Sequence, residues 1–250
     1  MNIDVHVHLE RGEYTREWLD KFIRRAIERE IVEVWFLDHS YLFPEFIPMY
    51  SGVLKRTAYI DEWFGKKAGK RSLVEYRRFA ESMHEADLPV KVRFGLEVCY
   101  FPGAETLVKK YSEGFDFLVG SIHFIDGFAF DHKAELWDGI DVDTAYRRFF
   151  ELSQELAKSG IFDGLAHPDS IKLFGHKPSF ALDEYYEKLA AALAGSGMYA
   201  EQNSGISRRT GAEYGMAPGL LTAMKRNGVK ILTASDAHCP EDIGDGIAKS

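Results

Sequence analysis

The chain has 250 residues, of which 46% are hydrophobic and 28% are charged, and its formal net charge at pH 7 is -8. This composition is ordinary for a soluble globular protein, and the length suits one large domain with a substantial core, such as a single α/β barrel. The negative charge argues against nonspecific binding to nucleic acid or to an anionic membrane surface, but it permits an anionic substrate if bound divalent cations dominate the local field.

Cysteine content and hydrophobic runs indicate the compartment. The two cysteines, Cys99 and Cys239, give no disulfide framework and fit a reducing environment. The chain enters an expected strand almost at once and contains no long uncharged apolar run, so we expect neither a targeting leader nor a membrane span. We therefore expect a cytoplasmic protein that binds neither nucleic acid nor membrane, and the sequence leaves its oligomeric state open.

Short β-branched or aromatic runs alternate with helix-period stretches along the chain. The expected strands are residues 2–8, 31–39, 90–98, 115–123, 161–167, 198–203 and 229–238, and the expected helices include 16–30, 72–86, 104–114 and 143–160. Alternation of this kind predicts a parallel sheet, and seven strands in a chain of this length favour a barrel over an open sheet. We find no internal repeat, low-complexity tract or linker, so residues 1–250 are expected to form a single domain.

The longest gap between expected strands, residues 40–89, is named here the 40–89 segment. It holds the helix 72–86, which an aromatic-rich loop precedes. A connection this long in a compact barrel is usually a lid or a pocket wall, and a packed surface excursion is the equal alternative. Its basic cluster, Lys66, Lys67, Lys70 and Arg71, is interpreted as a solvated lead-in to the helix rather than as a phosphate site.

The first strand contains "IDVHVH", residues 3–8. Because residues i and i+2 of a strand point to the same side, Asp4, His6 and His8 are expected to face one way and the apolar residues between them the other way. Taken alone, so short a motif fits a solvated strand face equally well.

Metal-capable side chains recur at the carboxyl ends of the expected strands. They are His6, His8, His39, Glu97, His123, His167, Asp236 and His238. In a barrel of parallel strands these ends converge on one face, where such a group without metal would place repelling imidazoles beside unneutralised carboxylates. Mixed histidine and carboxylate ligands suit Zn²⁺, Mn²⁺ or Fe²⁺, and eight ligands predict two or three ions. The remaining histidines, His84, His132 and His176, are interpreted as surface or loop residues.

A family resemblance follows from these motifs. "HVH", "DH" at 38–39, "GLE" at 95–97, "GSIHFIDG" at 120–127, "AHPD" at 166–169 and "SDAH" at 235–238 together resemble the PHP (polymerase and histidinol phosphatase) superfamily. Within it, "GSIHFIDGFAFD" and "FDGLAHPDSIKLFG" are similar to the monofunctional histidinol-phosphate phosphatases. The resemblance spans nearly the whole chain.

The resemblance implies a distorted (β/α)7 TIM-like barrel with a trinuclear metal site. The first ion would be held by His6, His8, Glu97 and Asp236; Glu97 would bridge to a second ion held by His123 and His167; and His39 and His238 would hold a third. The family commonly adds a histidine from the loop after the first strand, but that loop here reads "LERGEYT". Glu13 is the nearest candidate to replace it, with Glu10 behind it.

The implied reaction is hydrolysis of a phosphate monoester by a metal-bridging hydroxide, with Glu97, Asp236 and His238 as catalytic residues. Arginine suits the binding of phosphoryl oxygens, and "EQNSGISRRTG" offers Arg208, which we favour, and Arg209. Lys172 is a weaker candidate, and each of these cations also fits a solvated loop position.

The expected substrate is L-histidinol phosphate, which places the protein in histidine biosynthesis. A PHP phosphoesterase acting on a phosphotyrosine peptide, a nucleotide or another small phosphoester is the main alternative. A metal-stabilised barrel that only binds a partner is a further alternative, against which the full ligand set argues.

Overall fold

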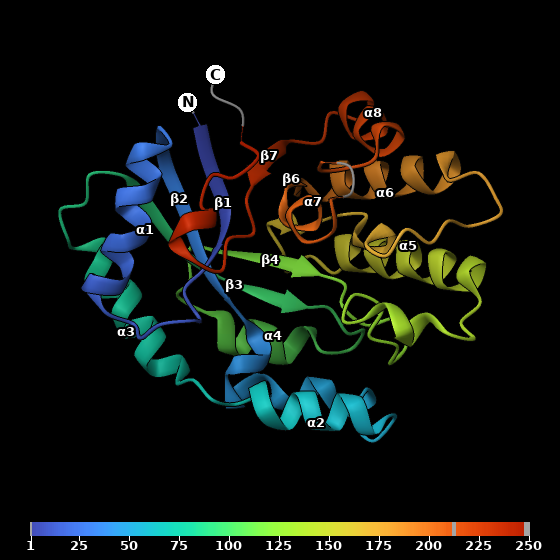
Figure 1. Ribbon diagram of the computed structural model, residues 1–250, viewed down its shortest axis with the longest axis horizontal. Helices are drawn as coiled ribbons and strands as arrows, with labels where there is room; N and C mark the ends of the chain where they lie inside the picture. The colour runs from blue at the N-terminus through green and yellow to red at the C-terminus, as the bar shows by residue number, and fades with distance from the viewer. Residues whose placement is uncertain (1, 212–213, 248–250) are drawn as a thin grey trace.

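Seven parallel strands lie side by side in chain order in the computed structural model, which describes residues 2–211 and 214–247 (Figure 1). They are β1 (Asn2–His8), β2 (Ile31–His39), β3 (Lys91–Cys99), β4 (Phe117–Ser121), β5 (Gly164–Leu165), β6 (Tyr199–Asn203) and β7 (Ile231–Ala234). The chain beyond β7 returns to β1 through a parallel bridge between Val7 and Ala237, where the His8 amide donates to the Ala237 carbonyl at 2.8 Å. The sheet is thus nearly closed, and the predicted (β/α)7 TIM-like barrel is confirmed.

Helices surround the strands. They are α1 (Arg16–Glu28), α2 (Ala58–Lys67), α3 (Leu73–His84), α4 (Glu105–Ser112), α5 (Val142–Lys158), α6 (Asp183–Ser196), α7 (Gly205–Thr210) and α8 (Pro218–Arg226). Short 3-10 helices lie at 40–42, 44–52, 134–137, 170–172 and 240–242. Side-chain caps set several starts: Thr15 accepts from the Trp18 amide at α1, and Asp141 accepts from the Thr144 amide at α5. None of the described helices combines the length and apolar character needed to cross a membrane.

The interior of the barrel is filled at its amino-terminal end. An apolar cluster there comprises Val5, Trp35, Leu37, Phe117, Val119, Ala166, Tyr199, Leu232 and Ala234. Two glycines make room for its rings: a Cβ on Gly95 would lie 2.7 Å from the Phe117 ring, and one on Gly164 would lie 2.2 Å from the Tyr199 ring. Because this plug excludes water, the open end of the barrel is the carboxyl end of the strands.

The first strand departs from the expected alternation. Its pairing with β2 shifts between Asp4 and Val7, so one extra residue is inserted as a bulge. Ile3 and Val5 therefore face the barrel interior together with His6 and His8. The prediction that Asp4 faces the same way as the two histidines is wrong, since its carboxylate accepts the amides of Ser235 and Gly244 at 2.9 and 2.8 Å.

The 40–89 segment leaves the barrel after β2 and returns to its own start. The amide of Gly69 donates to Tyr41 and that of Arg71 to Leu42, both at 2.9 Å. Between these points lies α2, at the lower edge of Figure 1, and α3 follows beside α1.

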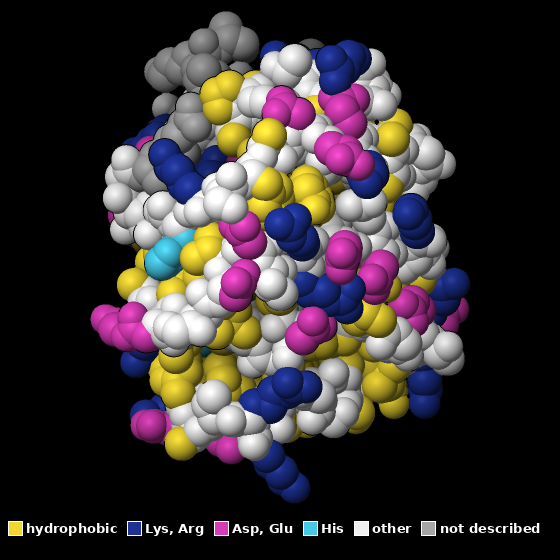
Figure 2. Space-filling view, turned by 90° about the vertical axis from the view of Figure 1, so that its right-hand side faces the viewer, with side chains coloured by type: hydrophobic (Ala, Val, Ile, Leu, Met, Phe, Trp, Pro, Cys, Tyr) yellow, Lys and Arg dark blue, Asp and Glu magenta, His cyan; other side chains and the backbone are white. Residues whose placement is uncertain are grey.

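On the face at the right-hand side of Figure 1, acidic and basic side chains are interspersed with hydrophobic ones (Figure 2).

Candidate metal centre

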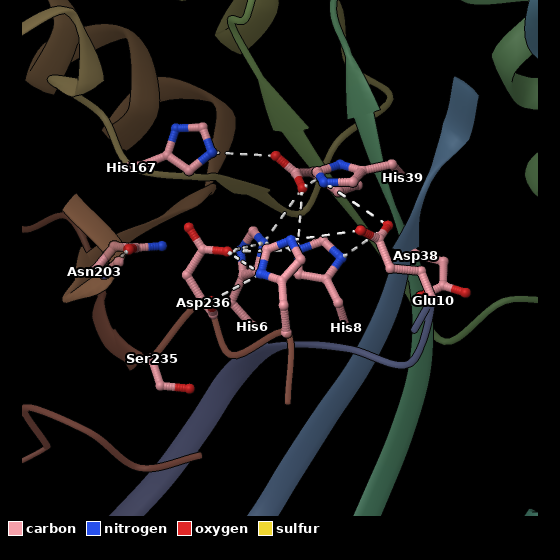
Figure 3. Close-up of polar contacts among 12 residues, drawn as sticks. His6, His8, Glu10, Asp38, His39, His167, Asn203, Ser235 and Asp236 are labelled. Atoms are coloured by element: carbon pink, nitrogen blue, oxygen red, sulfur yellow. Dashed lines mark hydrogen bonds and ion pairs between the residues drawn. The ribbon is translucent and has the colours of Figure 1, made fainter. Parts of the chain in front are cut away.

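The strand ends bring the eight predicted ligands into one cluster at the barrel mouth. Figure 3 shows His6, His8, His39 and Asp236 gathered around one point. His167 lies farther out, above Asp236 in this view. The backbone helps at two positions, because His167 and Asp236 adopt positive φ angles of 31° and 54° where the chain leaves β5 and β7. Residues more than 200 positions apart in sequence thereby become neighbours.

The first group of ligand atoms is the tightest. His6 Nε2 lies 3.0 Å from His8 Nε2, and these two nitrogens lie 3.3 and 3.5 Å from Glu97 Oε2. Asp236 Oδ1 is 3.7 and 3.5 Å from the same nitrogens. Four ligands at about 2.1 Å from one tetrahedral ion would lie about 3.4 Å apart, so these separations fit a single divalent ion.

Glu97 is the centre of the whole cluster. It is 1% exposed, and its Oε1 lies 2.9 Å from His123 Nε2 and 3.1 Å from His167 Nε2, which form the second group. Its Oε2, besides meeting the first group, lies 2.8 Å from His39 Nδ1. One carboxylate therefore connects all the ligand groups, as a bridging ligand would.

A third group is formed by His8, Glu10, His39 and His238, whose ligand atoms all lie within 4.8 Å of one another. Glu10 Oε2 lies 3.9 Å from His8 Nδ1, and Glu10 Oε1 lies 3.6 Å from His238 Nε2. Both His8 Nδ1 and Glu10 Oε2 are buried without a hydrogen-bond partner among the described residues. Orphaned polar atoms that face one another at this spacing fit a cation between them.

The first loop corrects one ligand prediction. Glu13, the favoured replacement for the family's histidine, is 89% exposed and lies 3.8 Å from Arg71, outside the cluster. A turn in which the Gly12 amide donates to the Leu9 carbonyl directs the chain away from the barrel before Glu13 is reached. Glu10, the alternative that the sequence left open, lies beside His39 and His238 instead.

Two carboxylates, the buried Glu201 and the partly buried Asp131, were missed by sequence reasoning and orient the imidazoles. Glu201 Oε1 accepts from His6 Nδ1 at 2.9 Å, and Asp131 Oδ2 accepts from His123 Nδ1 at 2.6 Å. In both rings this directs Nε2 toward Glu97, the arrangement that metal-binding histidines commonly show. The available signals were the inward position of Glu201 on its strand and the acidic residue in "FAFD" soon after His123.

The electrostatics of the cluster require positive charge. Burial disfavours protonation of His6, but Glu201 and Asp236 outweigh it and raise the pKa of that imidazole well above its ordinary value. Burial likewise disfavours the Glu97 anion, yet His39 and His6 hold the pKa of that carboxyl well below its ordinary value. Burial and the neighbouring His238 and His39 instead hold the pKa of His8 well below its ordinary value, so the crowded imidazoles do not all favour the charged form. Bound metal ions would supply the missing positive charge.

A pocket opens beside the cluster. Its wall includes Tyr41, Tyr59 and Trp63 of the 40–89 segment, together with Phe124 and His132. The interpretation of His132 as a loop residue is confirmed, but the side chain has an added role, because its ring lies 4.6 Å from that of Trp63 and lines the pocket. The loop after β4 folds back over the barrel mouth, which strand periodicity does not reveal.

The three candidate phosphate-binding cations have different surroundings. Arg209 lines the pocket and donates to the Asp131 carbonyl at 3.2 Å. Arg208 instead donates to the carbonyls of Ser235 and Asp236 at 2.8 and 2.7 Å. Lys172 donates to Asp169 at 2.9 Å and lies in a separate hollow. In this geometry Arg208 braces the backbone that carries Asp236, whereas Arg209 is the arginine that lines the pocket.

Comparisons with known proteins agree with this geometry. The sequence model of the PHP domain matches residues 4–205, a range that includes every clustered ligand except Asp236 and His238. A curated protein of Deinococcus radiodurans named "Probable histidinol-phosphatase" is 33% identical over 160 residues, which cover 61% of this chain and 60% of that protein. The matched region is thus less than two thirds of the length of that relative.

Two crystal structures have a similar fold. One is hisK from Listeria monocytogenes, with a TM-score of 0.76, 19% identity and coverage of 98% of both chains. The other is histidinol phosphate phosphatase from Lactococcus lactis complexed with zinc, L-histidinol and phosphate, with a TM-score of 0.69, 19% identity and coverage of 96% of this chain and 87% of that one. At this level of identity the two structures establish a shared fold.

Proposed function

Since the chain belongs to the PHP domain family, we propose that it hydrolyses phosphate monoesters with two or three divalent transition-metal ions, and that its substrate is L-histidinol phosphate. The observation that carries this proposal is the single buried carboxylate of Glu97, whose two oxygens lie within 3.5 Å of five imidazoles. A structural role explains one or two such contacts, whereas five fit a bridging ligand.

Each ligand group would hold one ion, and Zn²⁺, Mn²⁺ and Fe²⁺ suit these donors. The first ion would be held by His6, His8, Glu97 and Asp236, the second by Glu97, His123 and His167, and the third by Glu10, His39 and His238, with His8 as the neighbour shared by the first and third groups. Bound divalent ions supply a water of lowered pKa near neutral pH and neutralise charge on phosphoryl oxygens. Glu97, Asp236 and His238 are the residues we place closest to the reacting phosphoryl group.

The chain itself would bind and orient the ester. Arg209 stands at the pocket wall with its guanidinium held by the Asp131 carbonyl, where it can pair with phosphoryl oxygens. Arg208 keeps the segment of Asp236 in place from behind. The pocket wall covers the leaving group and limits access of bulk water to the site.

The pocket suits a leaving group that is both aromatic and cationic. Tyr59, Trp63 and His132 offer ring faces, which attract cations and planar heterocycles. Asp131 Oδ1 is buried without a hydrogen-bond partner among the described residues and can accept from a nitrogen. L-Histidinol carries an imidazole and an amine, and the names of the similar proteins support the same substrate. We place the reaction in cytoplasmic histidine biosynthesis.

A panel of phosphate monoesters tests the proposal after metal analysis of the purified protein. We expect L-histidinol phosphate to have the highest kcat/KM in a panel that also contains a phosphotyrosine peptide, a nucleoside monophosphate and glycerol phosphate. Preference for another ester would support the proposed phosphatase activity but contradict L-histidinol phosphate as the substrate. Absence of turnover on every ester in metal-loaded protein would favour a binding module instead.

A further inference from the structure

We propose that Arg71 is a positioning residue for the third group of ligands, because it fixes the loop after β1 so that Glu10 faces His39 and His238. The inference rests on the proposed use of this group as a metal site. It also reverses the interpretation of Arg71 as part of a solvated basic cluster, since the side chain is only 16% exposed.

The guanidinium of Arg71 binds the backbone of the loop at two points. Its Nη2 donates to the carbonyl of Glu10 at 2.5 Å and also to the carbonyl of Gly12. Its plane lies over the ring of Tyr14, with 4.9 Å between the guanidinium carbon and the ring centroid. The cation therefore spans the turn that carries Glu10, and the flat face of Tyr14 supports it.

Arg71 is itself anchored beside another member of the third group. Its amide donates to the carbonyl of Leu42 at 2.9 Å, and Leu42 follows His39 by three residues. Arg71 thus joins the chain after β2, which carries His39, to the loop after β1, which carries Glu10. The link sets the distance between two ligands that come from different strands.

The carboxylate of Glu10 depends on this support. Its Oε2 is buried without a hydrogen-bond partner among the described residues, so no hydrogen bond to this oxygen fixes the carboxylate, and the position of the Glu10 backbone matters the more. Neighbouring contacts secure the ends of the loop: the Leu9 amide and the Tyr14 hydroxyl donate to Asp38 at 3.0 and 2.6 Å. Arg71 holds the middle of this loop through its hydrogen bond to the carbonyl of Glu10, the residue whose side chain enters the third group.

The test compares Arg71→Met with Arg77→Met in the full-length metal-loaded protein. Arg77 is a matched control, because it also donates to a carbonyl, that of Tyr111 at 3.0 Å, and also stacks on a ring, that of Phe115, but away from the metal cluster. The readouts are ions bound per chain and the affinity of each ion, measured by chelator competition with Mn²⁺ or Zn²⁺ alone. Circular dichroism reports folding.

We expect Arg71→Met to weaken one ion by about 10- to 100-fold, the range typical of groups that orient ligands, while the other ions stay bound. Glu10→Ala should weaken the same ion, and the double variant should lose little more than either single one. Arg71→Lys, which keeps the charge but not the fork of donors, should give a smaller loss and covers the case in which Arg71→Met does not fold. Arg77→Met should retain every ion.

Equal affinities in Arg71→Lys, Arg77→Met and the unaltered protein would overturn the inference. A folded, unaltered protein that binds only two ions would also overturn it, since no third site would then exist to be positioned. Neither result bears on the first and second groups, so phosphatase activity could persist. Failure of the proposed function would appear separately, as normal three-ion binding without turnover.

Discussion

Glu97 shows how a single residue can determine the chemistry of this site. It lies near the carboxyl end of a central strand, it is buried, and its two oxygens face different sets of imidazoles. A buried carboxylate without compensating charge would be strongly destabilising, so its environment has to supply cations. The spacing of the surrounding nitrogens fits divalent metal ions in that role.

Replacing Glu97 with glutamine should separate catalytic from structural roles. The amide keeps the shape but loses the charge, so we expect kcat to fall by about 1,000-fold, equivalent to several kcal/mol of lost transition-state stabilisation, and metal content to fall with it. His84→Ala is the control, since His84 is 42% exposed and pairs with Asp116 at 3.1 Å. Similar losses of activity and metal in both variants would refute the ligand assignment.

At the scale of elements, the 40–89 segment joins two parts of the site. Its helix α2 buries Ile60 and Phe64 in the core while Trp63 lines the pocket. Gly69 and Arg71, which follow α2, donate their amides to the carbonyls of Tyr41 and Leu42, just after His39. A long insertion can therefore line the pocket and hold the loop that carries Glu10.

Trp63 should contribute to substrate choice. We expect Trp63→Leu to lower kcat/KM for L-histidinol phosphate by about 10-fold, because a ring contact with a cationic heterocycle is worth about 1 kcal/mol or more. Hydrolysis of glycerol phosphate, which lacks a ring and a cation, should change little. Parallel kinetics on the two esters measure the difference, and an equal loss on both would assign Trp63 a purely structural role.

The elements also show how far sequence reasoning reaches. Strand ends of a parallel barrel converge, so scattered residues such as His39 and His167 could be placed in one site from periodicity alone. Loops follow no such rule. Because of the turn at Gly12, Glu10 and not Glu13 lies in the cluster of metal-capable side chains. A bulge in β1 turns Asp4 away from its expected side. Burial of Arg71 and the inward position of His132 depend on tertiary contacts that no local pattern encodes.

At the scale of the whole molecule, the barrel separates stability from chemistry. The apolar plug closes the amino-terminal end. Outside the plug, Glu33 accepts hydrogen bonds from Trp35, Lys91 and Arg93 at 2.7, 3.2 and 3.0 Å. The carboxyl end holds the titratable cluster. A change at one end should therefore leave the function of the other largely intact.

Glu33 allows this separation to be tested through pH. Burial alone would raise the pKa of Glu33, but the hydrogen bonds from Trp35 and Lys91 outweigh it and lower that pKa. A carboxyl with a lowered folded-state pKa stabilises the fold above its unfolded pKa of about 4.3, and this contribution is lost as pH falls through the folded pKa. Glu33→Gln should thus reduce the free energy of unfolding by about 1 kcal/mol near neutral pH.

Urea unfolding of both proteins at neutral and acidic pH checks this prediction. The difference between them should shrink as the pH falls below about 4, where Glu33 becomes protonated in the unaltered protein too. Subtracting the two curves removes the titration of the metal cluster, which both proteins share. A difference that stays constant across this range would show that the charge of Glu33 contributes nothing.

Metal dependence of phosphatase activity tests the central claim most directly. The measurement is turnover of L-histidinol phosphate by protein whose metal content has been determined before and after chelation. We predict two or three transition-metal ions per chain before treatment, no turnover after their removal, and recovery when Zn²⁺, Mn²⁺ or Fe²⁺ is returned. Full turnover by a sample verified to be free of metal would contradict the account.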